Sequence, residues 1–338
     1  MSETILLAHG SGGELSHELV RDVFAHRFAN PILDELGDAA LFDVAGLSSG
    51  RLALTTDSYV VQPLFFPGGD IGKLAVCGTV NDLAVMGATP RYLSAGFILE
   101  EGLPLQTLEQ VVNSMADTAR AAGVEIVAGD TKVVERGAAD GLFINTAGVG
   151  VVPAGMYLTP ASLRPGDRVL INGPVGDHGM AVMMQREGLE FGSSLVSDCA
   201  PLNGLITTLL DAVPGAVRCM RDPTRGGLTT TLNEWAGTGI GIAVEETAIP
   251  VREEVRAVCE MLGLDPLYAA NEGKVVIAVA PRAVDKALDA LHAHPLGREA
   301  AVIGQVTAEH AGRVVLRTPL GARRVIHMLV GAQLPRIC

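Results

Sequence analysis

Short apolar strand-like segments alternate with helix-like segments along the sequence, and this alternation runs through the chain twice. The clearest helix covers residues 105–122, where apolar side chains recur at helical spacing up to Gly123. A proline-punctuated stretch, 153–165, interrupts the pattern before it starts again. At roughly 150 residues per domain, the 338 residues predict two domains, 1–154 and 155–330, followed by a flexible tail at 331–338.

The same patterns predict the individual elements, each bounded by glycine, proline or a capping residue. The predicted strands cover residues 51–56, 92–99, 124–128, 142–152, 167–172, 240–245, 274–279, 301–307 and 313–316. The predicted helices cover residues 71–86, 105–122, 204–213, 227–235, 253–262 and 281–293. Asn203 is the expected N-cap of the third helix.

Composition excludes several classes of protein. The net charge is −13, from 25 Lys and Arg against 38 Asp and Glu, which argues against nucleic acid as a partner. No apolar run approaches the ~18–20 residues that span a bilayer, and the first residues lack the basic start of a signal peptide. The five cysteines are scattered and form no C-x-x-C pair. We therefore expect a cytoplasmic protein that binds no membrane.

Small residues precede a helix-like stretch near the N-terminus and form the first candidate site. The run consists of His9, Gly10, Ser11, Gly12 and Gly13. Successive small residues before a helix leave backbone N–H groups free to bind an anion such as phosphate. The run matches neither a Walker A motif nor a dinucleotide fingerprint. A flexible glycine-rich loop without a ligand explains the same pattern.

Five carboxylates each lie at the end of an apolar segment. They are Asp57, Asp70, Asp82, Asp130 and Asp222. Mg²⁺ prefers oxygen ligands and joins phosphates to carboxylates, so an acidic protein could bind a nucleotide through such a set. The alternative for each one is an ordinary turn or N-cap aspartate.

Three further side chains could take part in chemistry. Glu272 lies in N-E-G-K just before a predicted strand, and Lys132 follows Asp130 by two residues. Either could transfer protons or belong to a solvated ion pair. Cys338, the last residue of the sequence, follows an aperiodic segment, which suits a thiol that carries a small group into a site. Such a residue could equally have no function.

Several motifs together resemble those of a known superfamily. T-T-D, N-D-L-A-V-M-G-A, G-D-T-K and R-D-P-T-R-G-G are similar to motifs of the ATP-binding superfamily of aminoimidazole ribonucleotide synthetase, which includes selenophosphate synthetase and thiamine-monophosphate kinase. Within it, the chain resembles the HypE family of hydrogenase maturation proteins. That closer resemblance rests on A-H-G-S-G-G, P-L-F-F-P-G-G-D-I-G-K-L-A-V-C-G-T-V-N-D, L-F-I-N-T-A-G, G-D-H-G, A-N-E-G-K and P-R-I-C.

The resemblance implies a fold, an activity and partners. The fold is the two-domain PurM-like α+β fold, in which the N-terminal sheets of a homodimer form a barrel and the C-terminal domain is an α/β sandwich. The activity is ATP-dependent dehydration of a carbamoyl group on the terminal cysteine to a thiocyanate, which supplies cyanide for the iron of [NiFe]-hydrogenase. The implied partners are the carbamoyltransferase HypF and the HypC–HypD scaffold.

The resemblance also implies roles for individual residues. Mg²⁺ would be held by Asp57, Asp70, Asp82 and Asp222. ATP would be bound by His9, Gly10, Ser11, Gly12, Gly13, Asp57, Lys73, Asn81, Asp82, Asp130 and Thr131. Catalysis would rest on Cys338, Glu272 and Lys132. Other functions within reach are a small-molecule kinase or synthetase of the same superfamily and a nucleotide-gated adaptor. Selenium chemistry is disfavoured, because the loop at 9–13 lacks a thiol.

Overall fold

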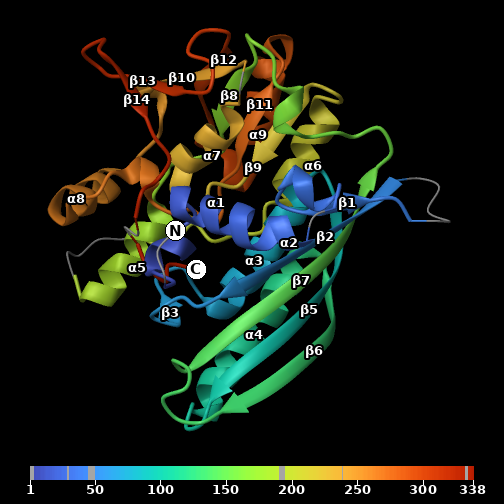
Figure 1. The fold of residues 1–338 in the computed structure, drawn as a ribbon, viewed down its shortest axis with the longest axis vertical. Coiled ribbons are helices and arrows are strands. Elements are labelled where there is room, and N and C mark those ends of the chain that lie inside the picture. Colours follow the sequence, from blue (N-terminus) through green and yellow to red (C-terminus); the bar gives the residue numbers. More distant parts are fainter. Residues whose placement is uncertain (1–3, 29, 45–49, 190–194, 238, 332–333) are drawn as a thin grey trace.

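The computed structural model describes residues 4–28, 30–44, 50–189, 195–237, 239–331 and 334–338. Its described part contains two large β-sheets, each covered by helices, which form an N-terminal body below and a C-terminal body above in Figure 1. This is the two-domain α+β architecture that the sequence predicts. None of the described helices combines the length and apolar character needed to span a membrane.

The N-terminal body is built on a five-stranded sheet. Its strands, in spatial order, are β1 (Ala40–Phe42), β2 (Gly50–Tyr59), β7 (Leu142–Pro153), β5 (Thr89–Glu100) and β6 (Glu125–Val134). Neighbouring strands are antiparallel except β5 and β6, which are parallel. The helices α3 (Ile71–Val85) and α4 (Leu105–Ala122) pack together and bury the core of this body. The sheet is open, and the described chain closes no barrel by itself.

The C-terminal body is a seven-stranded sheet between helices. Its strands, in spatial order, are β14 (Arg323–Ile326), β13 (Val314–Arg317), β10 (Gly241–Glu245), β12 (Ala301–Thr307), β8 (Arg168–Ile171), β11 (Val276–Val279) and β9 (Val217–Arg221). Two separate apolar cores lie on its two faces. One core includes α7 (Gly227–Trp235), and the other includes α6 (Asn203–Ala212) and α9 (Val284–His292). This is the expected α/β sandwich.

The remaining elements lie around these two sheets. The helices α5 (Asp177–Glu187) and α8 (Glu253–Leu262) share a smaller apolar core beside the C-terminal sheet. The N-terminal segment contains the short helices α1 (Glu14–Leu19) and α2 (His26–Phe28), and β3 (Phe65–Phe66) pairs with β4 (Gly69–Asp70). This segment reaches the C-terminal body, because the Glu14 amide donates to the Leu329 carbonyl at 3.0 Å.

Several predicted elements differ from the observed ones. The strand predicted to stop at residue 128 is wrong, because β6 continues through Gly129 and Asp130 to Val134. A Cβ at Gly129 would lie 2.7 Å from the Ala95 carbonyl oxygen, so this glycine allows close strand pairing and does not mark a turn. Asn203 is not the N-cap: it is the first residue of α6, and its amide donates to the Ala122 carbonyl at 2.8 Å.

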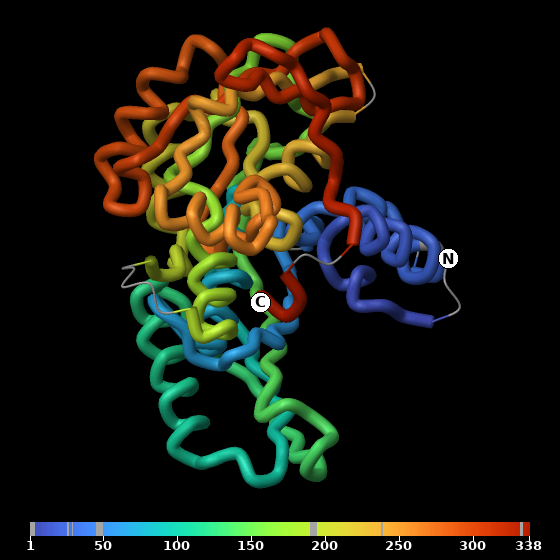
Figure 2. The backbone as a smooth tube through the Cα atoms, turned by 90° about the vertical axis from the view of Figure 1, so that its left-hand side faces the viewer, coloured from blue at the N-terminus to red at the C-terminus, as the bar shows by residue number. Residues whose placement is uncertain are grey.

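The described end of the chain, residues 334–338, runs from the C-terminal body into the space between the two bodies (Figure 2). It has the irregular backbone that the sequence predicts, and Ala332 and Gln333 lie outside the described residues. Its backbone is held by the segment after β2: the Val60 amide donates to the Cys338 carbonyl at 3.1 Å, and the Gln62 amide donates to the Arg336 carbonyl at 3.2 Å. The tail is therefore docked between the two bodies, with Ile337 buried and the other four described residues partly exposed.

Candidate active site

A cavity of about 350 Å³ between the two bodies collects residues that are far apart in the sequence. Asp57 comes from β2, Asp82 from α3, Asp222 from the position directly after β9 and Glu272 from the segment before β11. Cys338 of the tail lines the same cavity. The structure thus brings together three of the five predicted carboxylates, the predicted glutamate and the predicted thiol.

Burial and mutual repulsion raise the pKa of the carboxylates in this cavity. The pKa of Asp82 lies well above its usual range, first because the group is buried and then because Asp222 and Asp57 are close. Burial raises the pKa of Asp222 to about 8, and the charge of Asp38 adds to this rise. Burial likewise raises the pKa of Asp38 itself to about 6. Sequence patterns did not single out Asp38, which follows Gly37 in a segment without periodicity.

Two arginines balance part of this negative charge. Arg221 donates to Asp38 at 3.1 Å and to Glu234 at 2.9 Å. Arg225 lies 4.0 Å from the Asp57 carboxylate and also interacts electrostatically with Cys338. Arg225 belongs to the R-D-P-T-R-G-G motif, yet spacing alone gave it no role. Of the two arginines, Arg225 is the one whose positive charge lowers the pKa of the Cys338 thiol.

The Cys338 thiol is kept mainly neutral in its docked position. Burial raises its pKa to about 12, and the positive charge of Arg225 offsets part of this rise. A neutral thiol is a poor nucleophile, because the thiolate is the reactive form. The cavity therefore suits a group already attached to sulfur better than it suits attack by the free thiol.

Glu272 is buried, and its Oε1 atom is among the buried polar atoms that have no hydrogen-bond partner in the described structure. Burial raises its pKa well above the usual range, and Cys199 and Asp222 add to the shift. The neighbouring Lys274 donates to Asp198 at 2.9 Å, while Asp198 also accepts from the Glu272 amide at 3.1 Å. Lys274 therefore pairs with Asp198 and not with Glu272, and the Glu272 Oε1 atom can accept a hydrogen bond from a bound group.

The glycine loop near the N-terminus contributes one residue to the cavity, Gly12. Its φ of +75° favours glycine, and a Cβ there would lie 2.7 Å from the Arg225 carbonyl oxygen. Gly13 packs closely on Leu329. The other members make local contacts or none: His9 Nδ1 accepts from the Leu6 amide, Ser11 donates to Ala8, and a Cβ on Gly10 would meet open space.

Three other predicted ligands have structural partners outside the cavity. Asp70 caps the N-terminus of α3, where its carboxylate accepts from the Gly72 and Lys73 amides. The Lys73 ammonium donates to the Gly68 carbonyl at 2.8 Å. Asn81 joins the two bodies: its amide donates to the Ala200 carbonyl at 3.1 Å and its oxygen accepts from Leu202.

The structure also keeps Asp130, Thr131 and Lys132 out of this cavity. All three lie in the edge strand β6 and are exposed, and Lys132 forms an ion pair with Asp130 at 2.7 Å. The strand predicted before them stops at residue 128, so their place in an edge strand could not be predicted. Within one chain, Lys132 and Glu272 do not meet in the described cavity.

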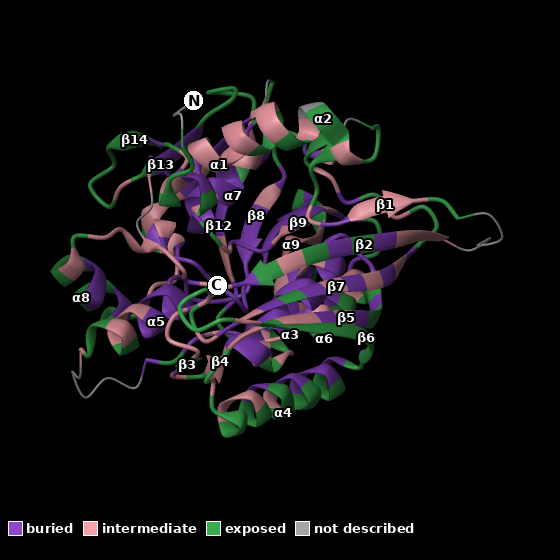
Figure 3. Ribbon diagram, turned by 60° about the horizontal axis from the view of Figure 1, so that its bottom comes forward, coloured by how far each residue is buried: buried purple, intermediate pink, exposed green. Residues whose placement is uncertain are grey.

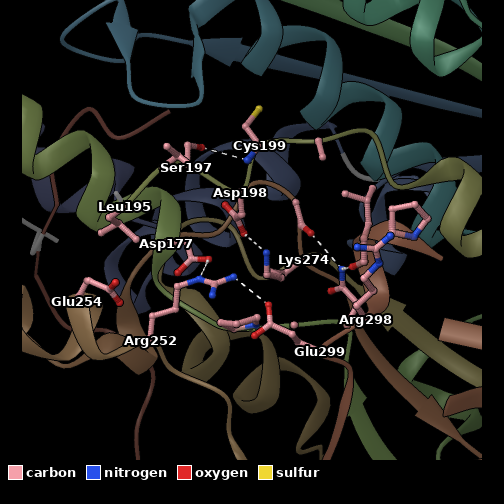
Figure 4. A pocket seen from close by; sticks show the side chains of 18 of the residues that line it. Asp177, Leu195, Ser197, Asp198, Cys199, Arg252, Glu254, Lys274, Arg298 and Glu299 are labelled. Carbon is pink, nitrogen blue, oxygen red and sulfur yellow. Dashed lines mark hydrogen bonds and ion pairs between the residues drawn. The ribbon is translucent and has the colours of Figure 1, made fainter. Parts of the chain in front are cut away.

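A second cavity of about 500 Å³ is lined in part by Gly273 and Lys274, the two residues that follow Glu272. Asp198 links the two cavities, since it lines this second cavity and holds the Glu272 amide. Figure 4 shows the Asp198–Lys274 pair beside Arg252, which donates to Asp177 at 3.1 Å and to Glu299 at 3.0 Å. Five of this cavity's charged side chains, Asp177, Asp198, Arg252, Lys274 and Glu299, are thus paired with one another. Among the described residues, no group of three or more His, Cys, Asp or Glu side chains is arranged to hold a metal ion.

Comparison with known proteins places both bodies in one family. Residues 36–152 match the N-terminal domain of AIR synthase related proteins, and residues 164–317 match their C-terminal domain. The chain is 53% identical over 336 residues to the carbamoyl dehydratase HypE of Azotobacter vinelandii, an alignment that covers 99% of this chain and 97% of that protein.

Solved structures are similar over nearly the full length. The crystal structure of the hydrogenase maturation protein HypE in complex with ATP has 52% identity and a TM-score of 0.82, covering 99% of this chain and 100% of that one. A chain in the crystal structure of a HypE–HypF complex has 48% sequence identity to this protein and a TM-score of 0.86, and the match covers 92% of this chain and 99% of that chain.

Proposed function

Because this chain belongs to the HypE family of carbamoyl dehydratases, we propose that Cys338 carries the carbamoyl group that it dehydrates. The protein is an ATP-dependent carbamoyl dehydratase of hydrogenase maturation. One observation supports this role for Cys338: its side chain lies in the cavity that also contains Asp57, Asp82, Asp222 and Glu272. The reaction needs a tethered substrate, a phosphate site and a proton acceptor, and that cavity contains candidates for all three.

The chemistry explains why these groups must meet. An amide oxygen is a poor leaving group, so the γ-phosphate of ATP is first transferred to the oxygen of the S-carbamoyl group, and nitrogen loses one proton. The C–O bond then breaks, phosphate leaves, and nitrogen loses its second proton as the C≡N bond forms. The product is a thiocyanate on sulfur. Alignment of the amide oxygen with the phosphate and removal of the protons are therefore the tasks of the protein.

Glu272 is the proposed proton acceptor. Burial raises its pKa, and a base with a raised pKa takes up a proton more effectively than an ordinary carboxylate. Its unpartnered Oε1 atom is free to accept a hydrogen bond from the substrate nitrogen. Arg225 lies beside the thiol and Asp57, where its charge can orient the carbamoyl oxygen.

No three carboxylates of the described residues are arranged to hold a metal ion alone, so we propose that Asp57, Asp82 and Asp222 hold Mg²⁺ together with the phosphate oxygens of ATP. They are hard oxygen donors, and burial together with their mutual repulsion raises the pKa of Asp82 and Asp222, a cost that a divalent cation would relieve. Bound Mg²⁺ would neutralise charge on the transferred phosphate. The glycine loop at residues 9–13 would place backbone amides near the same phosphates.

A homodimer would explain the position of Lys132, Asp130 and Thr131 on an exposed edge strand. Strand β6 has a single neighbouring strand among the described residues, and nine of its ten residues are exposed (Figure 3). The exposed side chains include Val127 and Val133, at 61% and 67%. A long exposed edge strand with apolar side chains is a ready surface for pairing. We propose that a second copy pairs along β6 and that Lys132 then serves the site of its partner.

The proposed partners follow the chemistry of the carried group. HypF, which forms a complex with a similar HypE chain, would supply the carbamoyl group, and the HypC–HypD scaffold would accept the cyanide for iron. We place these steps in the cytoplasm, since all five cysteines are unpaired.

The mass of the intact chain tests the role of Cys338. Incubation with carbamoyl phosphate and HypF should add one carbamoyl group, and Mg-ATP should then make that adduct lighter by one water. The Cys338→Ser variant should show neither change, while Cys259→Ser, a buried cysteine elsewhere, should behave as the wild type. A dehydrated adduct on any other residue would contradict the proposal.

Mixed dimers test the proposed exchange of Lys132. The single variants Lys132→Ala and Cys338→Ala should both lack activity. Mixing them should restore part of it, because one of the two sites then combines an intact Cys338 with the Lys132 of the partner. If the mixture stays inactive while light scattering shows a dimer, Lys132 does not act across the dimer.

A further inference from the structure

Helix α5 supplies two side chains that hold the tail, His178 and Arg186. His178 Nε2 lies 2.8 Å from the carbonyl oxygen of Ile337, the residue before the proposed carrier cysteine. His178 is fully buried and so is the Ile337 side chain, at 0% and 2% exposure. Because this carbonyl belongs to the peptide bond between Ile337 and Cys338, the hydrogen bond fixes the backbone directly before the thiol.

The surroundings of His178 determine which ring nitrogen carries the proton. The Cys199 amide donates to Ser197 Oγ at 3.1 Å, as drawn in Figure 4, and Ser197 Oγ lies 2.8 Å from His178 Nδ1. A proton on Nδ1 would leave Nε2 as an acceptor facing the Ile337 carbonyl, which has no proton to donate. The satisfied arrangement runs in one direction: Cys199 N–H to Ser197, Ser197 O–H to Nδ1, and Nε2–H to the Ile337 carbonyl.

Burial keeps the ring neutral, as this arrangement requires. The pKa of His178 is lowered, chiefly by desolvation, while Asp198 opposes that shift. The ring also packs edge-on against Phe66 of the N-terminal body, with ring centroids 5.3 Å apart. His178 therefore contacts both bodies and the tail from one position in α5.

Arg186, two turns further along α5, binds the same segment. Its guanidinium donates to the carbonyls of Pro335 and Arg336, each at 2.8 Å, and to the Gln62 carbonyl at 2.8 Å. The planar, multiply donating guanidinium suits such a cluster of carbonyl oxygens. Arg186 thus joins the tail to residues 60–62, the segment after β2 whose amides already donate to the tail.

We propose that His178 is a positioning residue for the dehydration: it donates Nε2–H to the Ile337 carbonyl and thereby sets the place of the Cys338 side chain in the cavity. Arg186 supports the same docked tail. This inference rests on the proposed carrier role of Cys338, but the docking that it describes can be measured without any catalysis.

Labelling of Cys338 with iodoacetamide in the full-length protein measures this docking. Loss of a hydrogen bond to a buried carbonyl should shift the docking equilibrium by about tenfold or more. His178→Ala should therefore raise the labelling rate of Cys338 by about that factor and slow the ATP-dependent dehydration of carbamoylated Cys338. His178→Gln, whose side-chain amide can donate to the same carbonyl, should restore both rates in large part.

His292→Ala is the matched control, because His292 Nε2 lies 2.9 Å from the Ala300 carbonyl and far from the tail in sequence. It should change neither rate. An unchanged labelling rate in His178→Ala would overturn the inference, as would an equal rise of labelling at the buried Cys77, which would show general loosening of the fold. Faster labelling of Cys338 in a protein that never dehydrates its adduct would retain the docking role and reject the proposed function instead.

Discussion

The carboxyl groups beside Cys338 titrate unusually because they are buried together. Asp222, Asp82 and Glu272 all have a raised pKa, and burial is the largest cause for each. A raised pKa shifts each of these groups toward its protonated form in the ATP-free protein. A protonated carboxyl group neither binds Mg²⁺ nor accepts a proton, so binding of Mg-ATP and release of protons should occur together.

The stability of the ATP-free protein should depend on pH through Asp222. Its pKa rises from 3.8 to about 8 on folding, so its stabilising contribution is complete below pH 4 and is lost as pH rises through 8. Asp222→Asn should remove at least about 1.4 kcal/mol of this pH dependence, the equivalent of one pKa unit. Urea unfolding at several pH values checks this. The exposed Asp211→Asn should keep the wild-type slope, and an equal slope in Asp222→Asn would contradict the expectation.

Glu272 should be needed for dehydration and not for loading. Glu272→Gln keeps the size of the side chain but cannot accept the proton, so single-turnover dehydration should slow by about 10²- to 10⁴-fold. Carbamoylation of Cys338 and ATP binding should remain. In the wild type the rate should rise with pH, because Glu272 has a raised pKa and must first lose its own proton. Glu254→Gln, which lines the second cavity, is the control, and a similar loss there would show a general effect.

At the scale of single elements, regular amphipathic helices could be predicted from the sequence. The helices α4 and α8 begin and end at the predicted residues, since each has a periodic apolar face and a glycine with positive φ at its end. Strand β6 was cut short because Gly129 and Asp130 resemble a turn, and only the pairing with β5 shows that the chain stays extended there. Strands β9 and β14 were not predicted.

Asp70 was expected to bind a metal ion, but its position at the N-terminus of α3 gives it a structural role as the N-cap. As the N-cap of α3, Asp70 should be replaceable by Asn with little loss, whereas Asp70→Ala should lower the free energy of unfolding by about 1 kcal/mol. If Asp70 is instead a metal ligand, both substitutions should weaken the binding of Mg-ATP. Urea unfolding and nucleotide titration of the two variants distinguish these roles. Weaker Mg-ATP binding by a stable Asp70→Asn variant would favour the metal role.

At the scale of the whole molecule, the site exists only because two bodies and a tail meet. The individual residues Asp57, Asp82, Asp222, Glu272 and Cys338 could be proposed from motifs and resemblance. Their convergence could not, because no spacing along the chain relates residues of different domains. Arg225 and Asp38 were missed for the same reason: each gains its role from neighbours across the interface. The place of the tail likewise depends on α5 and on residues 60–62.

The fate of the carbamoyl oxygen tests the account most directly. Cys338 is first loaded with a carbamoyl group that contains isotopically heavy oxygen, excess reagent is removed, and Mg-ATP is added in ordinary water. If the amide oxygen is phosphorylated and leaves as phosphate, one heavy oxygen should appear in inorganic phosphate for each thiocyanate formed on Cys338. Phosphate without the heavy isotope, released while the thiocyanate still forms, would contradict the central claim.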